Sequence, residues 1–304
     1  MSENNVIQEP DNGTPVTAEA PKKIRIGFVF LSVVPMAVLM MIQTIAQMPF
    51  LILSVVDAMN ESQAIPGLDI YTEMMSIFND KYAIYAYLIY SVIGLIVFPI
   101  WYYKGFVKKN PKVKMGDVFT VKSVISCIII VIALYFFITA FMNLAELLMP
   151  QAMAMYAEMI EVSGLVSNTA ITVIYAIILG PILEELVFRG VTYGFLEKAG
   201  VKPGIAILIS SLFFGAMHLI LIQVIYAAIL GLFLGFIRYK YRSIKITIVT
   251  HILFNFMGTY VSSILEQHEP GRAVTFILGG VAMFVLVFAI LLINSDKKAF
   301  KPVE

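Results

Sequence analysis

Charged side chains are scarce in this sequence. Asp, Glu, Lys and Arg together make up 13% of its 304 residues, whereas soluble domains carry about 25%. Hydrophobic residues reach 60%, which excludes an ordinary soluble domain and predicts a polytopic membrane protein surrounded by the lipid bilayer. The net charge of +1 gives no indication of a nucleic-acid partner, and none is expected.

Cysteine is almost absent as well. The single cysteine, Cys127, lies within an apolar run, so it cannot form an internal disulfide and is expected to be a small packing residue. A metal site built from cysteine spacing is therefore excluded.

Charge-free runs define the expected membrane spans and predict an all-α transmembrane bundle of about eight helices. Two of these are short helices within the single run 203–237, and they are expected to meet near 219–223. Gly231 and Gly235 give the second short helix a small-residue face suited to close helix contact. The other spans are expected at 27–56, 82–103, 123–145, 167–195, 246–265 and 273–295.

Basic residues alternate between the connections of these spans. They gather at both ends of the chain and in 104–122, 198–202 and 238–245, whereas the loops expected at 57–81, 146–166 and 266–272 are poor in Lys and Arg. This bias predicts that both termini are cytoplasmic. Short basic loops without a targeting signal are typical of a multi-pass protein of the bacterial plasma membrane.

Three regions follow from this layout. Residues 1–23 are polar and lack an apolar signal segment, which predicts a disordered cytoplasmic tail. Residues 24–166 are expected to form three N-terminal transmembrane helices. Residues 167–304 are expected to form a five-helix core, which contains every polar motif described below.

The stretch from Glu184 to Arg189 places two carboxylates and a guanidinium within or at the end of a lipid-embedded helix. One charged side chain near the centre of such a helix costs about 2.5–3.5 kcal/mol on insertion scales, so these residues are candidates for function. Glu185 and Arg189 are four apart and are expected to form a structural pair. Glu184 points about 100° away from that pair and has no local partner.

Further polar groups occur inside the later spans. His218 is expected in the fifth helix, and His251 and Asn255 in the seventh, where their spacing of four puts them on one face. Packing could explain any one of them alone. Together with Glu184 they are difficult to assign to packing, because almost no other ionisable group lies within a span.

The order of these motifs resembles a known family. Glu-Glu-x-x-x-Arg, Phe-x-x-x-His and His-x-x-x-Asn follow one another on successive helices within residues 167–260. This pattern is similar to that of the CPBP (Abi) family of intramembrane proteases, which are related to the type II CAAX prenyl endopeptidases and to bacteriocin-processing or immunity proteins. The resemblance implies hydrolysis of a peptide bond in a membrane-associated protein or peptide, with Glu184, Glu185, His218, His251 and Asn255 at the catalytic site.

Two mechanisms fit these residues. In the first, Glu184 is the base, His218 holds the same water, and His251 and Asn255 donate to the oxyanion. In the second, Glu184, His218 and His251 bind zinc and leave one coordination position open. Family members are often labelled metalloproteases, but the helical His-Glu-x-x-His signature is absent. Zinc and no cofactor are equally compatible with the sequence.

Two other classes of function stay open. One is a catalytically silent immunity or scaffold protein of the same fold. The other is a proton-coupled transporter, in which buried Glu and His side chains form a relay. A transporter would favour internal repeats, and none is found in the sequence.

Overall fold

The computed structural model describes residues 23–64, 69–108, 113–162, 170–261 and 271–300. All regular structure within these ranges is helical and none is extended, so the all-α class is confirmed. The expected tail at 1–23 lies, apart from Lys23, outside the described residues. The helices in chain order, with π-helical segments marked η, are α1 Ile26–Leu31, α2 Val34–Ala64, α3 Ile70–Ile77, η1 Phe78–Tyr82, α4 Ala83–Tyr102, η2 Tyr103–Val107, α5 Met115–Val118, α6 Val121–Leu148, α7 Pro150–Val162, α8 Ala170–Ile174, η3 Tyr175–Leu179, α9 Gly180–Glu185, η4 Leu186–Thr192, α10 Tyr193–Ala199, α11 Pro203–Ala216, α12 Leu221–Tyr241, α13 Ile244–Phe256, η5 Met257–Val261 and α15 Arg272–Asn294.

Six helical stretches of the described chain are long and apolar enough to cross a membrane. The other two expected spans correspond to α11, which has 14 residues, and to α13 with η5. At about 1.5 Å per residue, α11 is shorter than a full crossing of the hydrocarbon core. The six stretches are Ile26–Ser62, Ile70–Val107, Val121–Leu148, Ala170–Ala199, Leu221–Tyr241 and Arg272–Asn294.

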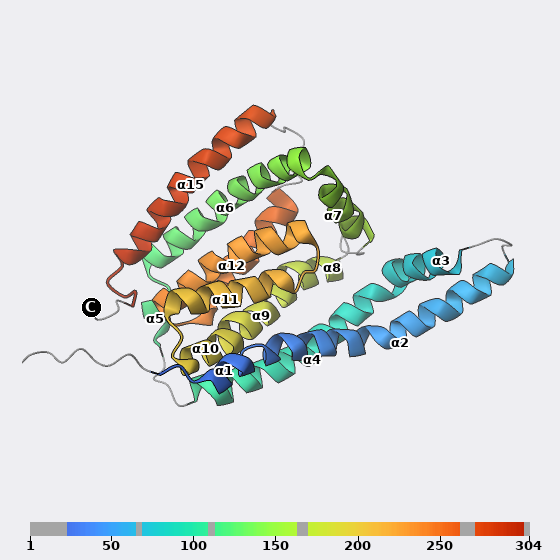
Figure 1. Ribbon diagram of the computed structural model, residues 1–304, viewed down its shortest axis with the longest axis horizontal. Coiled ribbons are helices and arrows are strands. Elements are labelled where there is room, and N and C mark those ends of the chain that lie inside the picture. Colours follow the sequence, from blue (N-terminus) through green and yellow to red (C-terminus); the bar gives the residue numbers. More distant parts are fainter. Residues whose placement is uncertain (1–22, 65–68, 109–112, 163–169, 262–270, 301–304) are drawn as a thin grey trace, which may run out of the picture.

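The acidic segment 57–81, expected to be a loop, is largely helical. Asp57 on α2 accepts hydrogen bonds from Lys81 Nζ at 2.7 Å and from the Tyr82 hydroxyl at 2.8 Å. These contacts compensate the charges between neighbouring helices, so the helices can continue through the polar stretch. Figure 1 shows the result, in which α2, α3 and the start of α4 extend beyond the rest of the bundle. The expected loop at 146–166 likewise contains a helix, α7.

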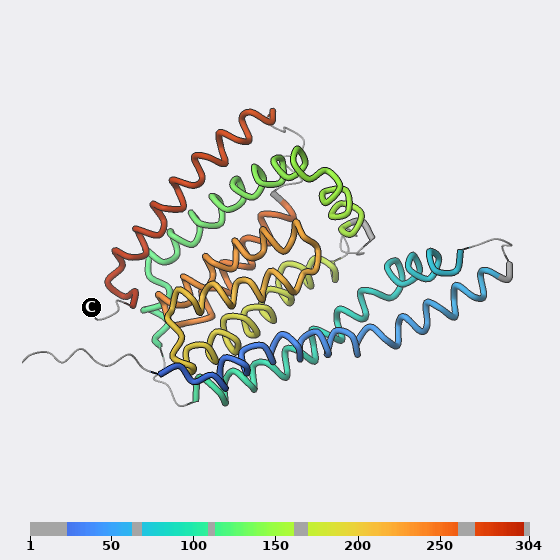
Figure 2. The backbone as a smooth tube through the Cα atoms, viewed as in Figure 1, coloured from blue at the N-terminus to red at the C-terminus, as the bar shows by residue number. Residues whose placement is uncertain are grey.

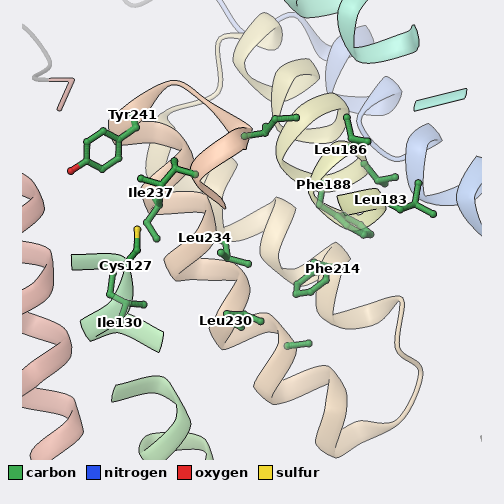
Figure 3. Packing of buried hydrophobic residues seen from close by; sticks show 14 of the residues in the cluster. Cys127, Ile130, Leu183, Leu186, Phe188, Phe214, Leu230, Leu234, Ile237 and Tyr241 are labelled. Atoms are coloured by element: carbon green, nitrogen blue, oxygen red, sulfur yellow. The ribbon is translucent and has the colours of Figure 1, made fainter. Parts of the chain in front are cut away.

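The two halves of the chain share one hydrophobic core. Buried side chains of α4, α6, η4, α11 and α12 belong to a single cluster, part of which is shown in Figure 3. Cys127 is buried in this cluster, as expected of a packing residue. The α6 helix also packs along α15, which places N-terminal and C-terminal spans side by side (Figure 2).

The small-residue face predicted on α12 is confirmed. A Cβ atom added to Gly231 would lie 2.9 Å from Ser211 Cβ, and one added to Gly235 would lie 2.9 Å from Ile207 Cγ2. Ser211 and Ile207 belong to α11, so the glycines permit the close antiparallel packing of α11 and α12.

The motif helix is continuous from Ala170 to Ala199, as predicted, and α2, α4, α11 and α13 pack against it. Two π-helical segments, η3 and η4, interrupt its α-helical hydrogen bonding. Such segments are rare and often lie at functional sites. Every residue of η4 is buried, so this part of the helix lies at the centre of the bundle. The helix ends at Gly200, whose φ of 81° provides the left-handed cap.

The predicted break between the two short helices is also present. The α11 helix ends at Ala216, α12 begins at Leu221, and Leu219 has a left-handed backbone with φ 64°. His218 was expected within a helix but lies in this turn. The helix stops before His218 because the chain reverses direction there to bring α12 back along α11.

Candidate active site

A buried ion pair lies at the centre of the site. Arg189 Nη1 is 2.8 Å from Glu185 Oε1, and neither side chain is exposed to solvent. The Arg189 guanidinium also lies over the ring of Phe214, 4.5 Å from its centroid. Removing both charges from water costs free energy. The ion pair with Glu185 and the contact with the aromatic face of Phe214 offset this cost for Arg189.

His251 of α13 connects the two glutamates. Its Nδ1 lies 3.2 Å from Glu185 Oε1 and its Nε2 lies 3.6 Å from Glu184 Oε2. Because a carboxylate only accepts hydrogen bonds, the Glu185 contact places a proton on Nδ1 and turns Nε2 toward Glu184. The imidazole is 2% exposed. The buried pair thereby fixes both the orientation and the tautomer of this histidine.

Glu184 differs from Glu185 in its surroundings. Its side chain is 18% exposed, against 0% for Glu185. The hydroxyl groups of Tyr90, Tyr175 and Tyr226 interact with it electrostatically. Glu184 is therefore the carboxylate that solvent or a ligand can reach. Sequence reasoning missed the three tyrosines because no spacing distinguishes them from the other aromatic residues of the spans.

Phe214 contacts both histidines. Its ring lies edge-on to His218 with centroids 5.2 Å apart, and edge-on to His251 at 5.5 Å. Its backbone carbonyl is 2.9 Å from His218 Nδ1. Figure 3 shows this side chain within the core beside Phe188. His218 is thus joined to the rest of the site through Phe214. This phenylalanine is the first residue of the Phe-x-x-x-His motif, and no role was predicted for it.

Asn255 connects α13 to the motif helix. Its Nδ2 donates to the backbone carbonyl of Ala176 in η3 at 2.9 Å. One side-chain N–H of Asn255 therefore has a structural partner. The structure brings Glu184, Glu185 and His251 into direct contact, and places Asn255 one helical turn further along α13.

The zinc hypothesis requires three ligands to meet. Glu184 Oε2 and His251 Nε2 are close enough to face one ion, but across the described ranges no three His, Cys, Asp or Glu side chains could hold a metal. His218, the expected third ligand, has its Nδ1 against the carbonyl of Phe214. As arranged here, these residues do not fit a zinc site.

Comparisons with known proteins identify the region that carries the motifs. Residues 166–257 match the family model described as type II CAAX prenyl endopeptidase Rce1-like. Over 101 residues the chain is 35% identical to "Putative membrane peptidase YdiL" of Bacillus subtilis (strain 168), an alignment that covers 33% of this chain and 38% of that relative. No solved structure matches the chain. The resemblance predicted from the three motifs is therefore confirmed: residues 166–257 are similar to the CAAX prenyl endopeptidase family, and the bacterial protein that the chain resembles is described as a putative membrane peptidase.

Proposed function

We propose that this protein is an intramembrane endopeptidase that hydrolyses a peptide bond of a membrane-associated protein or peptide. The observation that carries the proposal is His251, which lies buried between a fully buried glutamate and a partly exposed one. The match of this region to a peptidase family supports the same reaction. Substrates of CAAX type and bacteriocin-related peptides are both compatible with that family.

In this proposal Glu184 is the general base. It takes a proton from a water molecule while the water oxygen attacks the carbonyl carbon of the substrate. The C–N bond then breaks, and Glu184 returns the proton to the leaving amine. With its proton on Nδ1, His251 has an acceptor nitrogen, Nε2, beside the Glu184 carboxylate, so we assign Nε2 to accept a hydrogen bond from the water and hold it against Glu184.

Glu185 and Arg189 have a supporting role in this reaction. Glu185 accepts a hydrogen bond from His251 Nδ1–H and fixes the tautomer, as the acid of a Ser-His-Asp triad does. Arg189 holds Glu185 in its charged form through the 2.8 Å contact. From the sequence, His251 was expected to donate to the oxyanion. Because both of its nitrogens face glutamates, we assign the oxyanion to the second N–H of Asn255 and retain His218 as a ligand of the water.

The chemistry proposed here uses only side chains of the chain. Zinc would be held by Glu184, His218 and His251 if they converged, and it would act as a Lewis acid on the water. The present arrangement does not bring the three together, so we propose a metal-free mechanism. A strong chelator should therefore leave cleavage unchanged.

We further propose eight membrane-crossing segments, with both termini cytoplasmic in a bacterial plasma membrane. The Lys and Arg distribution supports this orientation, and the relative of known origin is bacterial. Residues 167–304 supply the catalytic groups, and helices from residues 24–166 pack around the motif helix.

The decisive experiment is Glu184→Gln in an assay of reporter-peptide cleavage in membranes. A neutral amide cannot take a proton from water, so the rate should fall by about 10²–10⁴-fold, while the protein accumulates and unfolds like the wild type. Glu158→Gln, an exposed substitution on α7, is the matched control and should cleave normally. Cleavage by Glu184→Gln at the wild-type rate would remove Glu184 from the mechanism, whereas a wild-type protein that does not cleave would favour the scaffold or transporter functions.

A further inference from the structure

A cavity whose lining does not include Glu184 or Glu185 lies at the end of the bundle where α12 ends and α13 begins. Its volume is about 790 Å³. Three basic side chains line it, Arg238, Arg242 and Lys245, together with one acidic side chain, Glu197. The proposed protease reaction uses none of these groups.

The charges lining this cavity do not balance. Arg242 Nη1 is 2.9 Å from Glu197 Oε1, and Arg238 Nη2 is 3.5 Å from Glu197 Oε2, so both guanidinium groups share one carboxylate. Lys245 Nζ contacts the thioether sulfur of Met115 at 3.2 Å, which is a weak acceptor. Three cations and one anion leave a net charge of +2 among the lining side chains. An anionic ligand would compensate this excess.

The backbone of the cavity wall also favours an anion. Arg242 has φ 52° because it forms the left-handed C-cap of α12. This turn leads directly into α13, whose first residues, Ser243 to Lys245, line the cavity. The positive end of the α13 dipole therefore lies beside the basic side chains.

The remaining wall is apolar and lies at the end of membrane spans. Phe106 and Val107 of η2 line the cavity at the end of the span Ile70–Val107, and α12 reaches it at the end of the span Leu221–Tyr241. A cationic site with an apolar wall at the ends of two candidate membrane spans fits a headgroup joined to acyl chains better than a free ion. Basic pockets between transmembrane helices bind lipid headgroups in this way.

We propose that this cavity binds the phosphate group of an anionic lipid headgroup, with Arg242 and Lys245 as its principal contacts. Guanidinium groups bind phosphate through paired hydrogen bonds. Arg238 connects the cavity to the motif helix, because its Nε donates to the backbone carbonyl of Arg189 at 3.3 Å. A bound lipid would thus contact Arg238, whose hydrogen bond to the Arg189 carbonyl holds the backbone of η4. The proposal does not depend on the protease function.

The test compares the wild type with the double variant Arg242→Gly/Lys245→Ala. Glycine accepts the left-handed backbone at position 242, so the substitution introduces no backbone strain, and the pair with Glu197 that it removes is partly exposed to solvent. The control is Lys202→Ala, an exposed lysine that does not line the cavity. Each protein is placed in phosphatidylcholine nanodiscs with and without phosphatidylglycerol, and retained lipid and thermal unfolding are measured.

Wild type and Lys202→Ala should retain phosphatidylglycerol and unfold at a higher temperature in its presence. The double variant should retain it about 30-fold more weakly, the effect expected for losing two basic contacts to an anionic lipid, and should show no thermal shift. Equal retention by all three proteins would overturn the proposal. An equal unfolding temperature of the wild type with and without phosphatidylglycerol would also overturn it, as would a full thermal shift when inorganic phosphate is added to discs of phosphatidylcholine alone.

Discussion

Replacing Arg189 by alanine should strongly destabilise the protein. The substitution leaves the carboxylate of Glu185 fully buried without its guanidinium partner. His251 is then the close side chain that still donates a hydrogen bond to it. Breaking a buried ion pair from one side costs about 3–5 kcal/mol. The guanidinium also loses its place over Phe214, a contact worth about 0.5–2 kcal/mol. We therefore expect the free energy of unfolding to fall by at least about 3 kcal/mol.

The free energy of unfolding can be measured in mixed detergent micelles by tryptophan fluorescence, since the chain has one tryptophan. The matched control is Arg272→Ala, which breaks an exposed pair with Glu146 and should cost about 0–1 kcal/mol. Adding Glu185→Gln to Arg189→Ala removes the isolated charge and should recover much of the lost stability.

Two results would refute this reasoning. The first is an Arg189→Ala variant that unfolds at the same free energy as Arg272→Ala. The second is a double variant no more stable than Arg189→Ala alone. Either result would mean that the Glu185–Arg189 contact does not compensate the buried charges, and the supporting role proposed for the pair would have to be withdrawn.

Three further predictions concern packing, pH and topology. Gly279→Ala should cost about 1–3 kcal/mol because its Cβ would overlap α6, whereas Gly280→Ala, with nothing nearby, should be neutral by thermal unfolding. Burial opposes ionisation of Asp296, but hydrogen bonds from Thr120 and its neighbours outweigh burial and lower its pKa from 3.8. The stability difference between wild type and Asp296→Asn should therefore be full at neutral pH and shrink below about pH 4; a pH-independent difference in unfolding would contradict it. A cysteine replacing Lys114 should resist an impermeant thiol reagent in intact cells and one replacing Glu158 should react, and the opposite labelling would reverse the orientation.

Local patterns predicted much of the fold. The continuous motif helix, the glycine face of α12 and the break between α11 and α12 all follow from spacing within one segment, and the structure contains all three. The helices in 57–81 and 146–166 were not predicted. A short stretch rich in charged residues has the composition of a loop. The contact of Asp57 with Lys81 on a neighbouring helix explains why the helix continues through this stretch.

The contacts of the candidate site were likewise predictable from the sequence only where both residues lie on one helix. The spacing of Glu185 and Arg189 was sufficient to suggest their contact, because both lie on one helix. The position of His251 between two glutamates depends on how α13 packs against α9, which no spacing within the sequence encodes. The same is true of Phe214, whose two histidine neighbours lie on separate segments.

The contact between Glu185 and Arg189 also has a consequence for biogenesis. Each charge alone would oppose partition of the helix into lipid by about 2.5–3.5 kcal/mol. Because both residues lie within four positions of one helix, they can neutralise each other as soon as that helix forms. The pair can therefore enter the bilayer as an electrically neutral unit before α13 has been synthesised, with Glu184 as the remaining charge of the motif. His251, which comes later in the chain, then completes the site by docking against a helix already in the bilayer.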